Sequence, residues 1–324
     1  MKLFLNILKW TGILLLIVII GLVLAVFTKY PPKFDKPYPA LTASMDSATI
    51  ARGKYLVYGP AHCAECHVSK LEDIESLGKG EMVPLIGGMK FSFPGAVIHS
   101  KNLTPDKTTG IGRYSDAELA RIIRYGVRPN NQALIPFMMY SNVSDEDLTA
   151  IISYLRIMTP VKHDIPDNQL NFLMKGIMAF FMKPFEPNGE VPKTVKRDTT
   201  IEYGKYLAND ISSCGYCHTK TNEMTGAYEG PLFAGGGKTP SATEEPGVWV
   251  ITPNLTPDPE TGRITNWSLQ QFQQRFHAGR VVKESIMPWE TFKNYSDDDL
   301  KAIYKYLNAL KPVKNEIGEQ IIHE

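Results

Sequence analysis

Apolar residues dominate the first 29 positions, and they alternate with polar residues along the rest of the chain. No residue from Trp10 to Thr28 carries a charge, and an unbroken run of Ile, Leu and Val fills positions 13–20. A helix needs about 20 apolar residues to cross the hydrocarbon core of a bilayer. Residues 1–29 are therefore predicted to form one retained membrane anchor. The alternative is a cleaved signal peptide, with Val23-Leu24-Ala25 as its cleavage site.

The segment that follows, residues 30–45, contains four prolines. Proline-rich segments favour extended backbone. We expect a tether that lifts the next domain off the membrane.

Four short segments of the remaining chain occur twice, in the same order. The pairs are Gly53–Leu56 with Gly204–Leu207, Cys63–His67 with Cys214–His218, Asn102–Asp106 with Asn254–Asp258, and Ser144–Leu148 with Ser296–Leu300. The offsets are 151 residues for the first two pairs and 152 for the others. Self-similarity at a fixed period indicates a repeated structural unit. It predicts a tandem duplication, with domains at 46–163 and 198–324 joined by an apolar linker at 164–197.

Both copies carry the same helix signals. Ser115 with Glu118, and Ser268 with Gln271, have the spacing of a capping box at a helix start. Each copy ends in a helix with apolar residues at helical spacing, followed by Pro160 or Pro312. The apolar positions of these last helices are Leu148, Ile151, Ile152 and Leu155 in the first copy, and Leu300, Ile303 and Leu307 in the second.

Glycines in the first helix of each copy, Gly53 and Gly204, are expected to let another helix approach closely. No convincing strand pattern lies between the helices. The predicted fold class is mainly α, with two tandem small helical domains after one N-terminal transmembrane helix. Such small domains have little core of their own and need a large apolar group at the centre.

The net charge and the positions of the cysteines limit the functions that this chain could have. The net charge is +1, and 34 acidic residues but only 32 of the 35 basic ones follow residue 30. This balance argues against nucleic acid as a partner. All four cysteines lie in two C-x-x-C-H motifs, Cys63–His67 and Cys214–His218.

C-x-x-C-H is the attachment motif of c-type haem. The two thiols add across the vinyl groups of the porphyrin, and the histidine becomes the proximal iron ligand. A structural zinc site would place two C-x-x-C motifs some 15–20 residues apart, and a thioredoxin-like pair needs a βαβ context. The motifs therefore predict two covalently bound haem c groups, with Cys63, Cys66, Cys214 and Cys217 as attachment sites and His67 and His218 as ligands.

The distal iron ligand is expected to be a methionine that precedes the last helix of each copy. Met287 has this position in the second copy. The equivalent residue in the first copy is Ile135, so Met138 is the first choice and Met139 the second. An open sixth position in the first copy is the remaining alternative. His62, His99, His163 and His277 are other candidates, but we expect each to be a surface or hydrogen-bonded histidine.

The sequence also predicts roles for three further groups of residues. Asn102 and Asn254 suit either turn stabilisation or a contact with a haem propionate. Phe137, Tyr140, Trp289 and Phe292 are expected to line the haem pockets. The apolar segment 171–182 is too short to span a bilayer. We expect it to pack between the domains, with contact with the membrane surface as the alternative.

Taken together, these motifs resemble a family of bacterial multihaem cytochromes c, and most closely the cytochrome subunits of membrane-bound alcohol and aldehyde dehydrogenases. The resemblance covers nearly everything after residue 46. It rests on the C-x-x-C-H pairs, the Asn-Leu-Thr-Pro-Asp segments and the acidic starts of the last helices. It implies thioether bonds at the four cysteines, His67 and His218 as proximal ligands and Met287 as a distal ligand. Members of the family often have three haem domains, whereas two tandem cytochrome c-like domains after one N-terminal transmembrane helix are predicted here.

The expected function is transfer of single electrons, because a six-coordinate haem has no open position for a substrate. The expected partners are a dehydrogenase as donor and a quinone or terminal oxidase as acceptor. The alternative is a dihaem enzyme such as a cytochrome c peroxidase. Covalent haem attachment takes place outside the cytoplasm in bacteria. We therefore expect a single-pass protein of the inner membrane with its haem domains on the periplasmic side.

Overall fold

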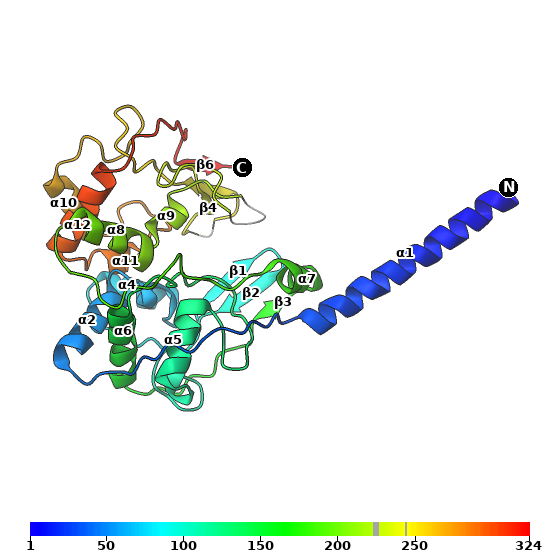
Figure 1. Cartoon of the computed structure of the whole chain (residues 1–324). Helices are drawn as coiled ribbons and strands as arrows, with labels where there is room; N and C mark the ends of the chain where they lie inside the picture. The colour runs from blue at the N-terminus through cyan, green and yellow to red at the C-terminus, as the bar shows by residue number, and fades with distance from the viewer. Residues whose placement is uncertain (223–226, 244) are drawn as a thin grey trace.

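The computed structural model describes residues 1–222, 227–243 and 245–324, whose regular secondary structure is mostly α-helix with two small sheets (Figure 1). The helices are α1 (Lys2–Lys29), α2 (Ser47–Tyr58), α3 (Cys63–Cys66), α4 (Leu71–Gly78), α5 (Asp116–Tyr125), α6 (Asp145–Ile157), α7 (Phe172–Phe181), α8 (Ile201–Tyr206), α9 (Cys214–Cys217), α10 (Leu269–His277), α11 (Trp289–Phe292) and α12 (Asp297–Asn308). The strands are β1 (Lys90–Phe93), β2 (Ala96–His99), β3 (Gln169–Leu170), β4 (Lys238–Pro240), β5 (Val248–Ile251) and β6 (Ile321–His323).

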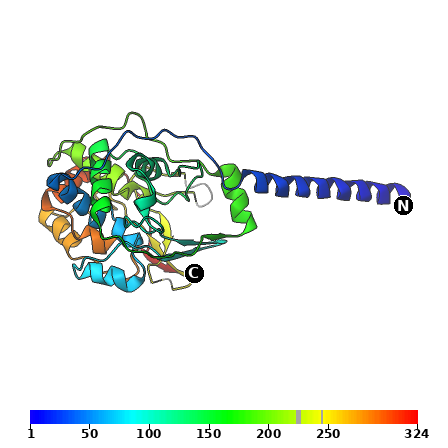
Figure 2. The same ribbon diagram turned by 90° about the horizontal axis from the view of Figure 1, so that it is seen from below.

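Helix α1 projects alone from the rest of the molecule (Figures 1 and 2). Within α1, only Val26 is buried. By length and composition α1 can cross a membrane, a property that it shares with signal sequences near an N-terminus.

Residues 30–45 are extended, as the prolines predict, but they do not hang free. The amide of Phe34 donates a hydrogen bond of 2.9 Å to the carbonyl of Asn131, and the amide of Ala133 donates one of 3.0 Å to Pro32. The chain that leaves α1 is therefore tied along the surface of the first half.

The predicted helix starts are confirmed. Glu118 N–H donates to Ser115 Oγ at 3.3 Å, and the Glu118 carboxylate accepts from Ser115 N–H at 2.7 Å. Ser268 and Gln271 repeat this capping box at 2.8 and 3.2 Å. Each pair satisfies two backbone donors that a helix end leaves without a partner.

Close helix packing at the two glycines is also confirmed. Helix α2 packs on α6, and α8 packs on α12. A Cβ atom on Gly53 would lie 1.9 Å from the carbonyl oxygen of Ala150, and one on Gly204 would lie 2.0 Å from that of Ala302. Only glycine fits at these two crossings, because real Cβ atoms never come so close to another atom.

The expectation of no strands between the helices is wrong. Strands β1, β2 and β3 form one antiparallel sheet, and β4, β5 and β6 form another. Each strand has two to four residues, too few to show a period of two in the sequence. The third strand of each sheet also comes from far along the chain, since Val97 pairs with Gln169 and Val248 pairs with His323.

The position expected for the apolar segment 171–182 is also wrong. It forms α7, which packs against the end of α1 rather than between the halves of the molecule (Figure 1). The Phe172 and Phe27 rings lie 6.2 Å apart, and the Lys29 ammonium lies 4.8 Å from the Phe180 ring centroid.

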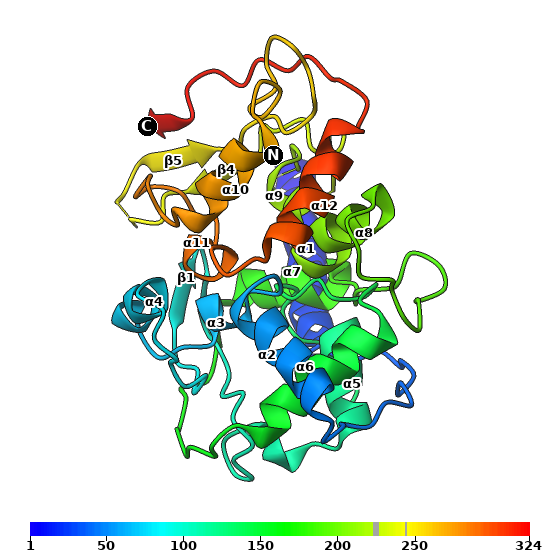
Figure 3. The ribbon, with the colours of Figure 1, turned by 90° about the vertical axis from the view of Figure 1, so that its left-hand side faces the viewer.

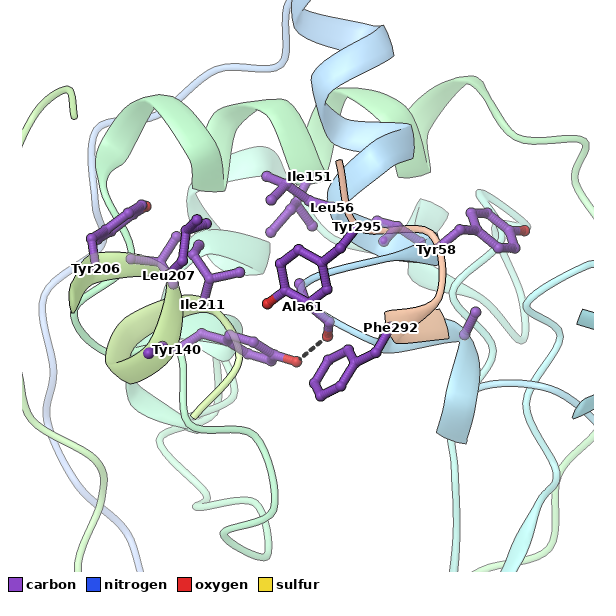
Figure 4. Close-up of a cluster of buried hydrophobic side chains, with 14 of the residues drawn as sticks. Leu56, Tyr58, Ala61, Tyr140, Ile151, Tyr206, Leu207, Ile211, Phe292 and Tyr295 are labelled. Atoms are coloured by element: carbon purple, nitrogen blue, oxygen red, sulfur yellow. Dashed lines mark hydrogen bonds between the residues drawn. The ribbon is translucent and has the colours of Figure 1, made fainter. Parts of the chain in front are cut away.

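Residues 46–163 and 198–324 meet across one continuous hydrophobic core. Figure 3 shows α2, α5 and α6 below, and α8, α10 and α12 above. Figure 4 shows side chains of both halves in a single cluster. Its labelled residues are Leu56, Tyr58, Ala61, Tyr140 and Ile151 from the first half, and Tyr206, Leu207, Ile211, Phe292 and Tyr295 from the second.

Candidate functional site

Each C-x-x-C-H motif forms a single helical turn that faces the shared core. The residue before each turn has a left-handed backbone, with φ of 40° at His62 before α3 and 51° at Ser213 before α9. This reversal turns the chain sharply and sets the direction of the motif. Cysteines three positions apart in one turn then lie on the same face.

All four cysteines are free thiols. Burial raises the pKa of Cys63 and of Cys214 to about 12, and it also raises the pKa values of Cys66 and Cys217. The thiols are therefore neutral in this environment. They form no disulfide and carry no thiolate charge of the kind found in reactive cysteines.

The two motif histidines are held in the same way. His67 Nδ1 lies 2.7 Å from the carbonyl oxygen of Lys101, and His218 Nδ1 lies 3.0 Å from that of Pro253. A carbonyl oxygen only accepts, so Nδ1 carries the proton and Nε2 keeps its lone pair. Burial lowers the pKa of each imidazole. A neutral ring with a fixed Nδ1–H and a free Nε2 is the form that ligates a metal.

A cavity of about 550 Å³ lies beside α9. Its wall contains Cys214, Cys217, His218 and Met287, so the structure brings together the four residues predicted for the second site. Most of the remaining wall is apolar and includes Ile264, Trp267, Phe272, Phe276, Trp289 and Leu307. This volume and lining are typical of a pocket for a cofactor or other small molecule, which occupies roughly 300–1,000 Å³.

Hydrogen bonds fix the loop that carries Met287. Arg280 binds Glu290 through two nitrogens, at 2.7 and 2.6 Å, and its Nη2 lies 3.3 Å from the carbonyl oxygen of Met287. The indole N–H of Trp289 donates to Ser285 Oγ at 3.0 Å. The backbone on both sides of Met287 is therefore anchored, and its thioether stays in the cavity wall.

The two methionines considered for the first site point to different places. Met138 packs against the core. Met139 lines the cavity beside α9, in the other half of the molecule. Residues 135–139 form a loop, whereas Met287 directly precedes the Pro288 cap of α11. The two methionine loops therefore differ in conformation, as the offset between Ile135 and Met138 predicts.

Part of this cavity wall comes from the opposite half of the molecule, which the sequence does not predict. His62, Phe137, Met139 and Tyr140 come from the first half and complete the wall around the second motif. The sequence predicts Phe137 and Tyr140 as haem-pocket lining but does not say which of the two pockets they line. No sequence signal could assign them to the opposite site, because that assignment depends on how the halves pack.

Two arginines, Arg263 and Arg275, also lie in this wall. The Arg275 guanidinium is 3.6 Å from the ring centroid of Trp289. Burial, together with the positive charge of Arg263, lowers the pKa of Arg275. The cavity thus combines an apolar interior with two cations, an arrangement suited to a flat apolar group that carries carboxylates. Nothing in the sequence distinguishes these arginines from others.

The structure shows which hydrogen bonds the side chains of Asn102 and Asn254 form. Asn102 donates to Thr109 Oγ1 and to the Val161 carbonyl, and its Oδ1 accepts from the amide and hydroxyl of Thr104. Asn254 makes the equivalent four bonds at 2.7–2.9 Å. Every polar atom of these side chains is used within the fold, so turn stabilisation is the correct one of the two predictions.

Two of the remaining histidines behave as predicted. His277 is a surface residue whose Nε2 lies 2.9 Å from Asp297 Oδ1, and this bond raises its pKa. His62 Nδ1 lies 3.3 Å from the Pro60 carbonyl. The His62 side chain is partly buried, and its ring meets the Phe292 ring edge-on at 5.5 Å.

Comparison with known proteins adds an independent observation. No protein-family model matches the chain. Over 303 residues the chain is 30% identical to the alcohol dehydrogenase (quinone) cytochrome c subunit of Gluconacetobacter polyoxogenes, covering 86% of this chain and 59% of that protein. It is 29% identical over 298 residues to the gluconate 2-dehydrogenase cytochrome c subunit of Pantoea cypripedii, covering 82% and 60%.

A third relative is closer in length. It is a diheme cytochrome c-type protein of Cereibacter sphaeroides, 24% identical over 297 residues, covering 88% of this chain and 92% of that protein. The chain spans about three fifths of the length of the two dehydrogenase subunits. These relatives confirm the resemblance predicted from the motifs.

Proposed function

We propose that this chain, a relative of the cytochrome c subunits of bacterial dehydrogenases, is a dihaem cytochrome c that passes single electrons between redox proteins at a membrane. The observation that carries the proposal is the site beside α9. There two thiols, a neutral imidazole with a free Nε2 and a thioether share one largely apolar cavity. These are the donor types that attach and ligate a c-type haem.

In this proposal Cys214 and Cys217 hold the second haem, with His218 and Met287 as iron ligands. Haem iron supplies reversible one-electron chemistry. The Pro253 carbonyl orients His218, and the apolar wall excludes water, which favours outer-sphere electron transfer over reaction with a substrate. The guanidinium groups of Arg263 and Arg275 compensate the negative charge of the haem propionates.

Cys63, Cys66 and His67 form the corresponding first site, with Met138 as distal ligand. The shared hydrogen bond from the histidine Nδ1 to a carbonyl supports this assignment. Met138 is preferred because Met139 lines the cavity of the opposite site. The repeated segments, capping boxes and asparagine turns support domains at 46–163 and 198–324 that arose by tandem duplication.

The proposed setting is the periplasmic face of a bacterial inner membrane, with α1 as a retained single-pass anchor. The proposed donor is a dehydrogenase, as the names of the relatives suggest, and the proposed acceptor is a quinone or a terminal oxidase. Contacts with such partners are expected to be small and transient.

Haem stoichiometry tests the proposal directly. The full chain, produced in a host that matures c-type cytochromes, should keep two haems per chain after denaturation, as counted from the pyridine haemochrome spectrum. Changing Cys63 and Cys66 together to Ala should leave one haem, and so should the same change at Cys214 and Cys217. Met45→Leu, at an exposed methionine outside both sites, is the matched control and should keep two. Colourless or zinc-containing protein would refute the proposal.

Turnover separates the relay from the alternative of a dihaem peroxidase. With hydrogen peroxide and a reduced cytochrome donor, the wild-type protein should show almost no catalysis, because both irons have six ligands. Rapid mixing with a one-electron reductant should instead reduce both haems. Sustained peroxide turnover with a high-spin haem in the spectrum would favour the enzyme.

A further inference from the structure

Helix α7 presents a stripe of large apolar side chains to solvent. Leu173, Ile177 and Phe181 are 71%, 42% and 76% exposed. They are four residues apart, so they lie on one face of the helix. The opposite side is occupied, since Met178 is buried and a Cβ atom on Gly176 would lie 3.5 Å from the Val26 side chain of α1. The stripe is therefore the free face of a helix whose other face is packed.

Helix α7 also contacts the exposed apolar end of α1 through Phe172, which lies outside the stripe. The rings of Phe27 and Phe172 lie 6.2 Å apart where α1 ends and α7 begins. Figures 1 and 2 show α7 beside the base of α1, at the side of the molecule from which α1 projects. If α1 crosses a bilayer, α7 is therefore the part of the folded domains that lies closest to the bilayer surface.

The chain around α7 can hold this position. Residues 32–34 form backbone hydrogen bonds with residues 131 and 133, so α1 does not hang from a loose tether. Strand β3 pairs with β2, and the Asn171 amide donates to the Gly95 carbonyl at 2.9 Å, which fixes the entry into α7. The segment that follows α1 and the segment that precedes α7 are thus both held by hydrogen bonds to the first half of the molecule, which fixes the orientation of α7 relative to α1.

The charges on α7 and nearest to it in the sequence are positive, and the closest acidic residues are Asp167 before it and Glu186 after it, the latter paired with Lys36. Residues 168–185 include two lysines, Lys175 and Lys183, and no acidic residue. The Lys29 ammonium lies above the Phe180 ring, and that of Lys175 is 5.8 Å from the Tyr30 ring centroid. A cavity of about 580 Å³ between the ends of α1 and α7 includes Lys29, Phe180 and Lys33 in its wall. Basic groups beside aromatic and apolar ones suit the boundary between anionic headgroups and acyl chains.

We propose that α7 is a membrane-surface helix. Its stripe of Leu173, Ile177 and Phe181 enters the boundary between headgroups and acyl chains of the bilayer that α1 crosses. The neighbouring lysines contact anionic headgroups. Two attachments, one spanning and one lying on the surface, fix the height and tilt of the globular part above the membrane. The inference rests on the part of the proposed function in which α1 is a retained anchor.

Photolabelling from within the bilayer tests this. The full chain is reconstituted into vesicles of phosphatidylcholine and phosphatidylglycerol that contain a phospholipid with a diazirine in its acyl chain. After illumination, labelled peptides are identified by mass spectrometry. Both α1 and the peptide spanning residues 170–183 should carry label. A double variant, Leu173→Glu with Phe181→Glu, should lose most of the α7 label and keep that of α1.

Leu71→Glu is the matched control, because Leu71 is 57% exposed on α4, and α4 lies away from α1 (Figure 1). It should leave both labels unchanged. Circular dichroism of each variant verifies the fold, and Leu173→Ser with Phe181→Ser replaces the glutamates if these prevent folding. Removing phosphatidylglycerol should weaken the α7 label, and an unchanged α7 label would overturn the role of the lysines.

Two other outcomes would overturn the inference, and they differ in what they say about the anchor. Label on α1 with none on α7 would refute the surface helix alone and leave the anchor intact. Label on neither helix would refute the surface helix and the anchor together. The measurement requires no redox activity, so it is independent of whether the chain carries electrons.

Discussion

The Tyr55 hydroxyl in the first half of the molecule donates a hydrogen bond of 2.7 Å to the Asp299 carboxylate in the second half. The reciprocal bond also exists, because Tyr206 donates to Asp147 at 2.9 Å. Arg52 completes the network with two bonds to Asp147, at 2.8 and 2.9 Å. Each half thus supplies a tyrosine that satisfies a buried carboxylate of the other, and both carboxylates lie in the first turn of a last helix.

Removing one of these hydroxyls should destabilise the joint between the halves. In Tyr55→Phe, the largely buried Asp299 carboxylate loses its donor, and leaving a buried polar group unsatisfied costs about 1–3 kcal/mol. Denaturant unfolding followed by far-UV circular dichroism should show a lower unfolding free energy of that size. Tyr228→Phe, at a tyrosine that is 53% exposed, should change it little. Equal stability of both variants would contradict a structural role for the bond.

Adding a methyl group at a helix crossing should be more damaging. In Gly204→Ala the new Cβ would lie 2.0 Å from the Ala302 carbonyl oxygen, so α8 and α12 must separate. Overpacking typically costs about 1–3 kcal/mol, and a clash with backbone should reach or exceed the upper end. A lower thermal midpoint and reduced yield are expected. Gly230→Ala, where the nearest atom is 3.7 Å away, is the control. Tolerance of Gly204→Ala would show that the helices are farther apart.

Asp210 should make stability depend on pH. Burial raises its pKa from 3.8 to about 6. Between these values the folded state binds more protons than the unfolded state, so this contribution to stability is lost as pH rises from about 4 to about 6. Asp210→Asn should therefore match the wild type below pH 4. Above pH 6 it should be more stable by ~1–2 kcal/mol, after a discount for partial exposure.

Denaturant titrations of both proteins from pH 4 to 8 measure this difference. Asp198→Asn provides a control of opposite sign, because hydrogen bonds from Thr200 lower the pKa of Asp198. That variant should lose stability above pH 4 instead of gaining it. A pH-independent difference for Asp210→Asn would contradict the burial of its carboxylate.

The ligand assignment at the second site predicts a change in reduction potential. Replacing a thioether ligand with an imidazole lowers the potential of a haem, and axial ligands together span about 0.8 V. Met287→His should therefore lower one of the two midpoints by on the order of 0.1 V and leave the other unchanged. Redox titration of the visible spectrum measures both. Two unchanged midpoints, as expected for Met45→Leu, would exclude Met287 as a ligand.

The sequence predicted features that depend on local chemistry. The pair Ser115 and Glu118 predicts a helix start, because its capping hydrogen bonds form within four residues. Gly53 and Gly204 indicate close packing because no other residue leaves that space. That Cys214, Cys217, His218 and Met287 line one cavity agrees with the sequence, in which the first three are close together and Met287 precedes a recognisable helix.

Features that depend on distant segments could not be predicted. The strand Gln169–Leu170 has two residues and exists only because Val97 lies beside it. Tyr140 lines the cavity of the opposite half because the two halves pack on one core. The position of α7 depends in turn on α1, over 140 residues earlier in the chain. Each of these depends on tertiary packing, which leaves no local pattern.

The single core that joins the halves has a kinetic consequence for the proposed relay. Two redox centres in halves that share one hydrophobic core are held against rotation relative to each other, so the distance between them is set by the fold. The rate of electron transfer between the two centres should be insensitive to solvent viscosity and to ionic strength. Arrival and departure of electrons depend on diffusional encounters, and these two steps alone should slow in glycerol or respond to added salt.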